Sequence, residues 1–185
     1  NTAIGLARGQ YIAFLDHDDE LRENALLTVV QMFANHPGLK VLYSDEDKID
    51  QSGVRFDPYF KPDFNLGLLR SHNYLCHFAV YERGLIDQLG GLRPGCEGAQ
   101  DYDLALRAVD AVHPHEIGHV SKVLYHWRTA TGSTASGHGN KNYAFEAGRR
   151  ALAAHLQRRG IRGEVIEAPE APGMYRIRWQ RPDPA

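Results

Sequence analysis

Short apolar runs that end in acidic residues alternate along this chain with longer segments of helical periodicity. Tyr11 to Leu15 is an apolar run of strand length, and it stops in the acidic segment Asp16 to Asp19. Lys40 to Ser44 repeats the pattern, and the acidic segment Asp45 to Asp47 follows it. Helix and strand patterns in alternation, with acids at strand ends, predict an α/β sheet that binds ligands at those ends.

Further periodic segments supply the rest of the predicted fold. Leu21 to Asn35 is the clearest helix, because its apolar residues recur at helical spacing and it stops before a Pro-Gly pair. Other helices are expected at Thr2–Arg8, Arg83–Leu89, Asp101–Ala111 and Lys141–Arg159. Other strands are expected at Tyr74–Tyr81, His119–Arg128 and Tyr175–Trp179. The remaining long segments are expected to be irregular at Gln51–Pro62 and a mobile loop at Thr129–Asn140.

Composition is that of an ordinary globular domain. The chain has 185 residues, 43% of them apolar and 24% charged, which fits one domain of usual size. The net charge of −2 gives no electrostatic footprint for nucleic acid. No stretch has the 18 apolar residues or so that predict a membrane-spanning helix. The two cysteines, Cys76 and Cys96, are too few for a disulfide framework and fit a reducing compartment.

The segment Asp16 to Asp19 carries the strongest chemical signal. Its carboxylates are close enough to repel one another, and a divalent cation such as Mg²⁺ or Mn²⁺ would remove that repulsion. Such an ion takes further ligands from water and substrate phosphates. The alternative is a solvated loop in which one aspartate caps the next helix. The second segment, Asp45 to Asp47, is expected to be a solvated turn rather than a second metal site.

Four other patterns allow both a functional and a structural interpretation. Asp101 begins a helix after a glycine-containing loop, so it is either a helix cap or a general base. His126 and Arg128 share one face of a strand, where they either bind a metal and a phosphate or end the strand in solvent. The loop Gly132 to Gly137 is either a lid over phosphates or a connector. Pro58 to Phe64 is expected to pack under the sheet, with a sugar-stacking surface as the alternative.

Seven segments together resemble family 2 glycosyltransferases with the GT-A fold. They occur in family order over roughly residues 1 to 160, and they are NTAIGLARGQY, FLDHDDEL, YSDEDKID, FKPDFN, NYLCHFAVY, GGLRPGCEGAQDYDLALR and HVSKVLYHWRTATGSTA. The likeness is to bacterial enzymes that build O-antigen and other cell-surface polysaccharides. It implies a mixed sheet flanked by helices, with the domain at residues 1–160 and a C-terminal extension or linker at 161–185. Because the family's first strands have no counterpart here, the chain is expected to be truncated at its N-terminus.

The resemblance also implies roles for individual residues. Asp16-His17-Asp18 resembles the DXD motif, which implies Asp16 and Asp18 as metal ligands, with His126 as a later ligand. Asp101 resembles the catalytic base. The residues implied on the nucleotide-sugar and diphosphate side are Asn1, Arg8, Asp16, Arg128 and Ser133. The residues implied on the acceptor side are Gln100 and His77.

The activity implied is inverting transfer of a hexosyl or rhamnosyl group from a nucleoside-diphosphate sugar to a glycan hydroxyl, with Mn²⁺ or Mg²⁺. The implied partners are that donor, a glycan or lipid-linked glycan acceptor, and other domains of a longer polypeptide. The implied location is the cytoplasm, with the inner face of the membrane as a further expectation. Two alternatives stay open: a non-catalytic glycan- or nucleotide-sugar-binding module, and a metal-dependent phosphotransferase or nucleotidyltransferase.

Overall fold

The computed structural model describes residues 1–129 and 138–180 of the chain. Its helices are α1 (Thr2–Leu6), α2 (Ala25–Asn35), α3 (Leu66–Leu69), α4 (Arg83–Leu89), α5 (Gln100–Ala111), the short 3₁₀ helix η1 (Pro114–Glu116) and α6 (His138–Arg158). Its strands are β1 (Tyr11–Ala13), β2 (Glu20–Leu21), β3 (Val41–Ile49), β4 (Arg55–Tyr59), β5 (Ala79–Glu82), β6 (Ile117–Arg128), β7 (Gly163–Glu167) and β8 (Tyr175–Trp179).

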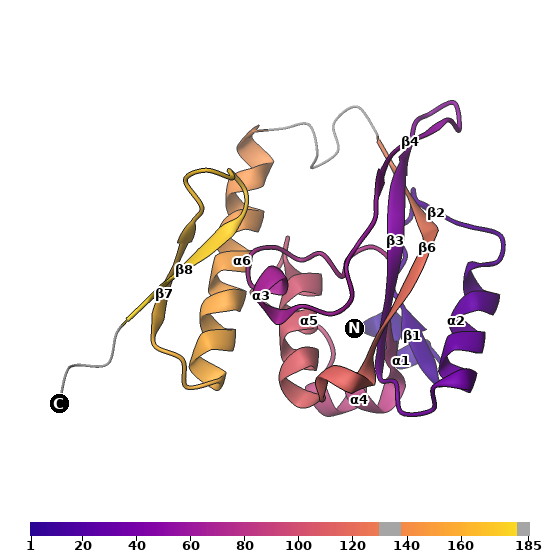
Figure 1. Ribbon diagram of the computed structural model, residues 1–185, viewed down its shortest axis with the longest axis horizontal. Coiled ribbons are helices and arrows are strands. Elements are labelled where there is room, and N and C mark those ends of the chain that lie inside the picture. The colour runs from indigo at the N-terminus through magenta and orange to yellow at the C-terminus, as the bar shows by residue number, and fades with distance from the viewer. Residues whose placement is uncertain (130–137, 181–185) are drawn as a thin grey trace.

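Within the described residues, six strands form one mixed sheet that lies between α2 and α5 (Figure 1). The strand order is β1-β5-β3-β6-β2, and β4 pairs with β3 beside this path. The long strands β3 and β6 run parallel, from Val41 beside Ile117 to Ile49 beside Arg128, whereas the other pairs are antiparallel. The two long strands therefore carry their C-terminal halves to the same end of the sheet.

Helices cover both faces of this sheet (Figure 1). On one side α2 buries Ala25, Val29 and Phe33 against Val80 and Leu124 of the strands. On the other side α4, α5 and α6 contribute to a larger core that includes residues of β1, β3 and β5. Burial of apolar side chains on both faces supplies the main stabilising free energy of this arrangement.

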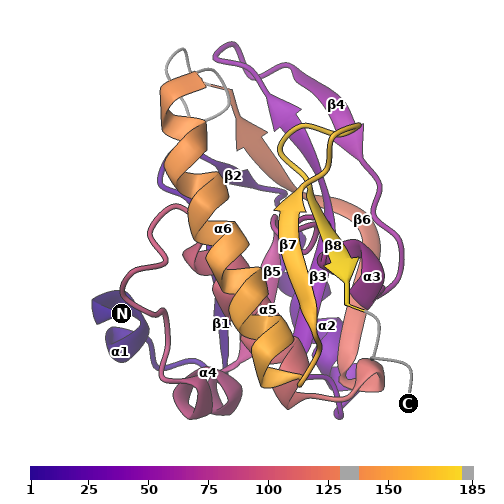
Figure 2. The ribbon, with the colours of Figure 1, turned by 90° about the vertical axis from the view of Figure 1, so that its left-hand side faces the viewer.

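The C-terminal segment forms a hairpin that packs on α6. The strands β7 and β8 pair antiparallel and lie beside α6 (Figure 2). Val165 and Tyr175 of the hairpin belong to the same core cluster as Leu156 of α6, and the Tyr175 hydroxyl donates to the carbonyl of Phe145 at 3.0 Å. The predicted strand at Tyr175–Trp179 is confirmed, and the division of the chain at residue 160 stays a prediction.

The predicted solvated turn at Asp45 to Asp47 is wrong. Strand β3 continues through these acids to Ile49, and Asp45 and Asp47 are only 3% and 4% exposed. Burying an unpaired carboxylate is costly, and each of the three acids has a cationic or imidazole partner. These partners are His119 for Asp45, Lys61 for Glu46, and both Arg55 and His126 for Asp47.

Several predicted boundaries also shift, because tertiary pairing decides them. The first helix ends at Leu6, and the second begins only at Ala25, since Leu21 pairs with Tyr125 in the sheet. The expected strand at Tyr74–Tyr81 shortens to β5, and the expected irregular segment Gln51–Pro62 contains β4.

The aromatic segment from Pro58 to Phe64 does not lie wholly under the sheet. Phe64 packs against the core, but Phe60 is 69% exposed. The expectation that this segment packs under the sheet therefore holds for Phe64 and is wrong for Phe60. Among the described residues, no helix combines the length and the hydropathy that crossing a bilayer requires.

Candidate functional site

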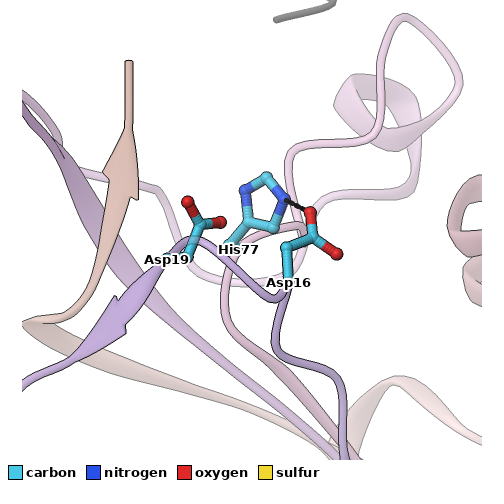
Figure 3. Close-up of side chains that lie close together, drawn as sticks. All are labelled: Asp16, Asp19 and His77. Atoms are coloured by element: carbon cyan, nitrogen blue, oxygen red, sulfur yellow. Dashed lines mark ion pairs between the residues drawn. The ribbon is translucent and has the colours of Figure 1, made fainter. Parts of the chain in front are cut away.

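Asp16, Asp19 and His77 converge at one end of the sheet (Figure 3). One ligand atom from each lies within 4.8 Å of the others, and the Asp16 carboxylate is 3.8 Å from Nε2 of His77. The two aspartates follow β1, and His77 precedes β5. Because β1 and β5 pair antiparallel, the end of one strand meets the start of the other. The sheet therefore builds this group, which we call the Asp16–Asp19–His77 cluster.

Asp19 is the rigid member of the cluster. Its side chain accepts a hydrogen bond from the backbone N–H of Arg128 at 2.7 Å and another from the Tyr125 hydroxyl. Burial raises the pKa of the Asp19 carboxyl, although these two hydrogen bonds act in the opposite direction. A cation beside Asp19 would favour its charged form. Asp16 is more open to solvent, and its backbone N–H reaches the same Tyr125 hydroxyl at 3.3 Å.

His77 stands between the cluster and a second carboxylate. Its ring stacks on Tyr125, with 4.7 Å between ring centroids and 16° between planes. Nδ1 faces Oε2 of Glu46 at 3.5 Å, so Nε2 faces Asp16. Burial lowers the pKa of the His77 imidazole, but the carboxylates of Glu46, Asp16 and Asp101 outweigh burial and raise it above its usual value.

Arg128 borders the cluster at the end of β6. Its guanidinium donates to the carbonyl of Asp18 at 2.7 Å and to the carbonyl of Asp50 at 3.1 Å, and it pairs with Glu20. The pairing of β2 with β6 explains this approach, because Glu20 lies beside His126 in the register. The structure thus brings Asp16 and Arg128 to one region, as their shared predicted role on the diphosphate side requires.

His126 lies in a different environment from its neighbour Tyr125. Successive side chains of a strand leave it on opposite sides, and Tyr125 contacts Asp19 whereas Nδ1 of His126 lies 2.5 Å from Oδ1 of Asp47. His126 is buried in that pair. Among the described residues, the metal-ligand cluster includes neither His126 nor Asp18, so the metal roles expected for these two stay predictions.

Asp101 lies in the first turn of α5, and its carboxylate does not cap that helix. Helix α5 follows Ala99, whereas Oδ2 of Asp101 accepts a hydrogen bond from the side-chain amide of Asn73 at 3.0 Å. Burial, followed by the charge of Asp101, raises the pKa of the nearby Cys76 thiol and keeps it neutral. Asp101 is therefore held against the segment that ends in His77 and does not cap α5, and its role as a base stays a prediction.

The other predicted site residues are less informative. Gln100 accepts a hydrogen bond from the backbone of Gly98 at 2.8 Å, within the loop before α5. Asn1 bonds the backbone of Leu92 at 2.8 Å, and Arg8 is exposed after α1. Ser133 and the predicted lid at Gly132 to Gly137 lie outside the described residues.

Sequence reasoning did not single out Asp19 within the acidic segment, placed His77 on the acceptor side, and missed four further contributors to the site. Glu46 and Lys61 hold His77, Asn73 holds Asp101, and Tyr125 holds Asp19. Asn73 and His77 belong to one short segment of the sequence, which could have directed attention to Asn73. Lys61 carried no such signal, because its partner Glu46 was expected in solvent.

The comparison with known families gives one match. Residues 1–90 match the family described as Glycosyl transferase family 2.

Two curated relatives align with almost all of the chain. The uncharacterized protein y4gI of Sinorhizobium fredii is 48% identical over 179 residues, which are 97% of this chain and 20% of that protein. The O-antigen biosynthesis protein RfbC of Myxococcus xanthus is 42% identical, again over 97% of this chain and over 14% of that protein. The chain therefore spans about a fifth or less of the length of these relatives.

Solved structures share the fold at low sequence identity. TarS 1–349 of S. aureus superposes with a TM-score of 0.59 and 19% identity, over 84% of this chain and 43% of that one. The mannosyltransferase PcManGT from Pyrobaculum calidifontis, in complex with GDP-Man and Mn²⁺, superposes with a TM-score of 0.50 and 16% identity, over 85% and 41%. These neighbours are GT-A glycosyltransferases, and the predicted fold class is confirmed.

Proposed function

We propose that this chain, whose residues 1–90 match glycosyl transferase family 2 and which has the GT-A fold, performs inverting transfer of a sugar from a nucleoside-diphosphate donor to a hydroxyl of a cell-surface glycan. The observation that carries this proposal is the Asp16–Asp19–His77 cluster, with Arg128 bound beside it and Asp101 close enough for its charge to raise the pKa of His77. The likeness to an O-antigen biosynthesis protein supports a bacterial polysaccharide as the product.

The Asp16–Asp19–His77 cluster is the proposed cation site. Two carboxylates and one imidazole suit Mn²⁺ better than Mg²⁺, which prefers oxygen ligands alone. The Mn²⁺ in the PcManGT complex supports the same type of ion. When bound, such an ion neutralises the charge that develops on the departing diphosphate.

Arg128 is the proposed second contact for the diphosphate. A guanidinium offers two parallel N–H groups to phosphate oxygens, and this one is held beside the acidic loop by the carbonyls of Asp18 and Asp50. Its ion pair with Glu20 is partly exposed, so the pair can be exchanged for a phosphate at small cost.

Asp101 is the proposed general base. As the acceptor hydroxyl attacks the anomeric carbon on the face opposite the diphosphate, Asp101 takes its proton. The new glycosidic bond forms while the bond to the diphosphate breaks, which inverts the anomeric centre. A single carboxylate is enough for this direct displacement. Asn73 donates to Oδ2 of Asp101 and leaves the other oxygen to accept the proton.

Calorimetric titration of this chain with UDP, GDP and dTDP, with and without Mn²⁺, tests the proposal. We expect Mn²⁺-dependent binding of one nucleotide, with clearly weaker binding in Asp16→Asn and His77→Ala. Asp87→Asn and His36→Ala change exposed residues of the same types and serve as controls. If Asp18→Asn alone weakened the binding, the cation would be assigned to Asp18 instead. No Mn²⁺-dependent binding of any nucleotide would contradict the proposal for this chain.

A further inference from the structure

A buried ion pair lies directly behind His77. Lys61 and Glu46 are 3.1 Å apart, and the Lys61 side chain has no exposed surface. Desolvating two charges costs several kcal/mol, and a buried ion pair often stabilises a protein no more than apolar residues of the same volume would. The pair therefore calls for an explanation other than stability.

Both members of the pair hold residue 77. Oε2 of Glu46 accepts a hydrogen bond from the backbone N–H of His77, and Nζ of Lys61 donates to the backbone carbonyl of His77. The same Glu46 oxygen faces the imidazole Nδ1 at 3.5 Å. The backbone of His77 is thus hydrogen-bonded by groups from β3 and from the segment after β4, and its ring faces the same Glu46 without a hydrogen bond to it.

These contacts of Glu46 and Lys61 determine which imidazole nitrogen of His77 faces the cluster. With Nδ1 directed at Glu46, Nε2 is directed at Asp16, 3.8 Å away. The stack on Tyr125, whose hydroxyl bonds Asp19, fixes the plane of the ring. Metal-binding histidines commonly donate their other ring N–H to a carboxylate, which fixes ring orientation and strengthens the ligand.

We propose that Glu46 and Lys61 are positioning residues that orient Nε2 of His77 as a ligand for the divalent cation. This inference rests on the proposed cation site. Glu46 acts on the ring and on the backbone N–H, and Lys61 acts on the backbone carbonyl and on the orientation of Glu46. Neither residue belongs to the Asp16–Asp19–His77 cluster.

Titration of the chain with Mn²⁺ tests the positioning role of Glu46 and Lys61. Binding is measured as the loss of the free Mn²⁺ signal in electron paramagnetic resonance. Glu46→Gln should weaken Mn²⁺ binding by about tenfold or more, the usual effect of removing such a supporting carboxylate. Lys61→Met should also weaken Mn²⁺ binding. The exposed Glu164→Gln on β7 is the matched control and should bind as the unmodified chain does.

A double variant separates positioning from general damage. If Glu46 acts through His77, then His77→Ala with Glu46→Gln should bind Mn²⁺ no more weakly than His77→Ala alone. Thermal melts identify any variant that fails to fold, and the Lys61→Met result then decides.

Two results would overturn the inference in distinguishable ways. Unchanged Mn²⁺ affinity in Glu46→Gln, or an equal further loss in the His77→Ala background, would overturn the positioning role and leave the cation site intact. Absence of Mn²⁺ binding by the unmodified chain would overturn both proposals together.

Discussion

Two acidic segments of this chain look alike in sequence, and the fold uses them differently. Asp16 to Asp19 and Asp45 to Asp47 each follow an apolar run of strand length. The first segment leaves the sheet after β1, where Asp16 and Asp19 meet His77 and the Arg128 guanidinium binds the carbonyl of Asp18. The second stays within β3, where protein groups pair all three acids. An acid that leaves the strand can serve a ligand, whereas an acid inside the strand needs a partner from the protein.

The largest effect on activity is expected at Asp101. Like the acids of the segment Asp16 to Asp19, Asp101 is free of a lysine or arginine partner within the described residues, and the side-chain amide of Asn73 holds it. Asp101→Asn should lower turnover of the bound donor by about a hundredfold to ten-thousandfold, since the base is lost. Release of nucleoside diphosphate measures this. Mn²⁺ affinity and the melting temperature should stay unchanged, and near-normal turnover would refute the assignment.

A large effect on stability is expected at Asp47, from the strand segment. Asp47→Ala leaves the buried His126 without its partner and breaks the pair with Arg55. The free energy of unfolding should fall by about 3–5 kcal/mol. Denaturant titration measures this, with the exposed Asp87→Ala as control. Mn²⁺ affinity of the folded fraction should not change, and a selective loss of Mn²⁺ binding would place the metal at Asp47 and His126 instead.

A smaller effect is expected at Tyr125, which links the loop to the sheet. Tyr125→Phe removes the hydroxyl that donates to Asp19 and accepts from Asp16. Leaving a buried acceptor without its partner should cost about 1–3 kcal/mol of unfolding free energy. The exposed Tyr143→Phe should be neutral in the same denaturation experiment. If both substitutions behave alike, the hydroxyl does not fix the loop.

The smallest effect is expected in how the free energy of unfolding depends on pH. Asp19 of the first segment and Glu46 of the second should change it in opposite directions. Burial raises the pKa of Asp19, so in metal-free protein its contribution to stability falls as pH rises from about 4 through its folded pKa. Burial would also raise the pKa of Glu46, but His77 and Lys61 outweigh it and hold the pKa low. The contribution of Glu46 is therefore present above about pH 4 and is lost as pH falls through its folded pKa.

Unfolding free energies measured from pH 3 to 7 in EDTA would show this contrast. Relative to the unmodified chain, Asp19→Asn should gain stability between pH 3 and pH 7, and Glu46→Gln should lose stability over the same range. Parallel curves for the two variants would show that the segments do not differ electrostatically.

Much of the fold could be predicted from the sequence, because hydrophobic periodicity is a local property. The helix at Asp101–Ala111 and the strands at His119–Arg128 and Tyr175–Trp179 form nearly as expected. Strand pairing is not local, and it determined the outcome at the acidic segments. Nothing near Asp47 in the sequence indicates that the parallel register of β3 and β6 places His126 beside it.

The non-local nature of strand pairing also explains which site residues could be predicted from the sequence. Asp16, Arg128 and Asp101 could be singled out by residue type and position along predicted elements. Which of His77 and His126 lies beside the acidic loop could not be predicted, because it depends on which strand borders β1. Strand β5 does, so His77 reaches the acidic loop while His126 is taken by Asp47.

The parallel pairing of β3 with β6 also has a consequence for how the chain folds. It joins segments far apart in the sequence, Val41 beside Ile117, and such pairings form slowly because a long loop must close first. Tyr125 and Arg128, which fix Asp19, arrive only with β6. The proposed cation site therefore needs β6 in place, and Mn²⁺ binding during refolding would report the docking of that strand in real time.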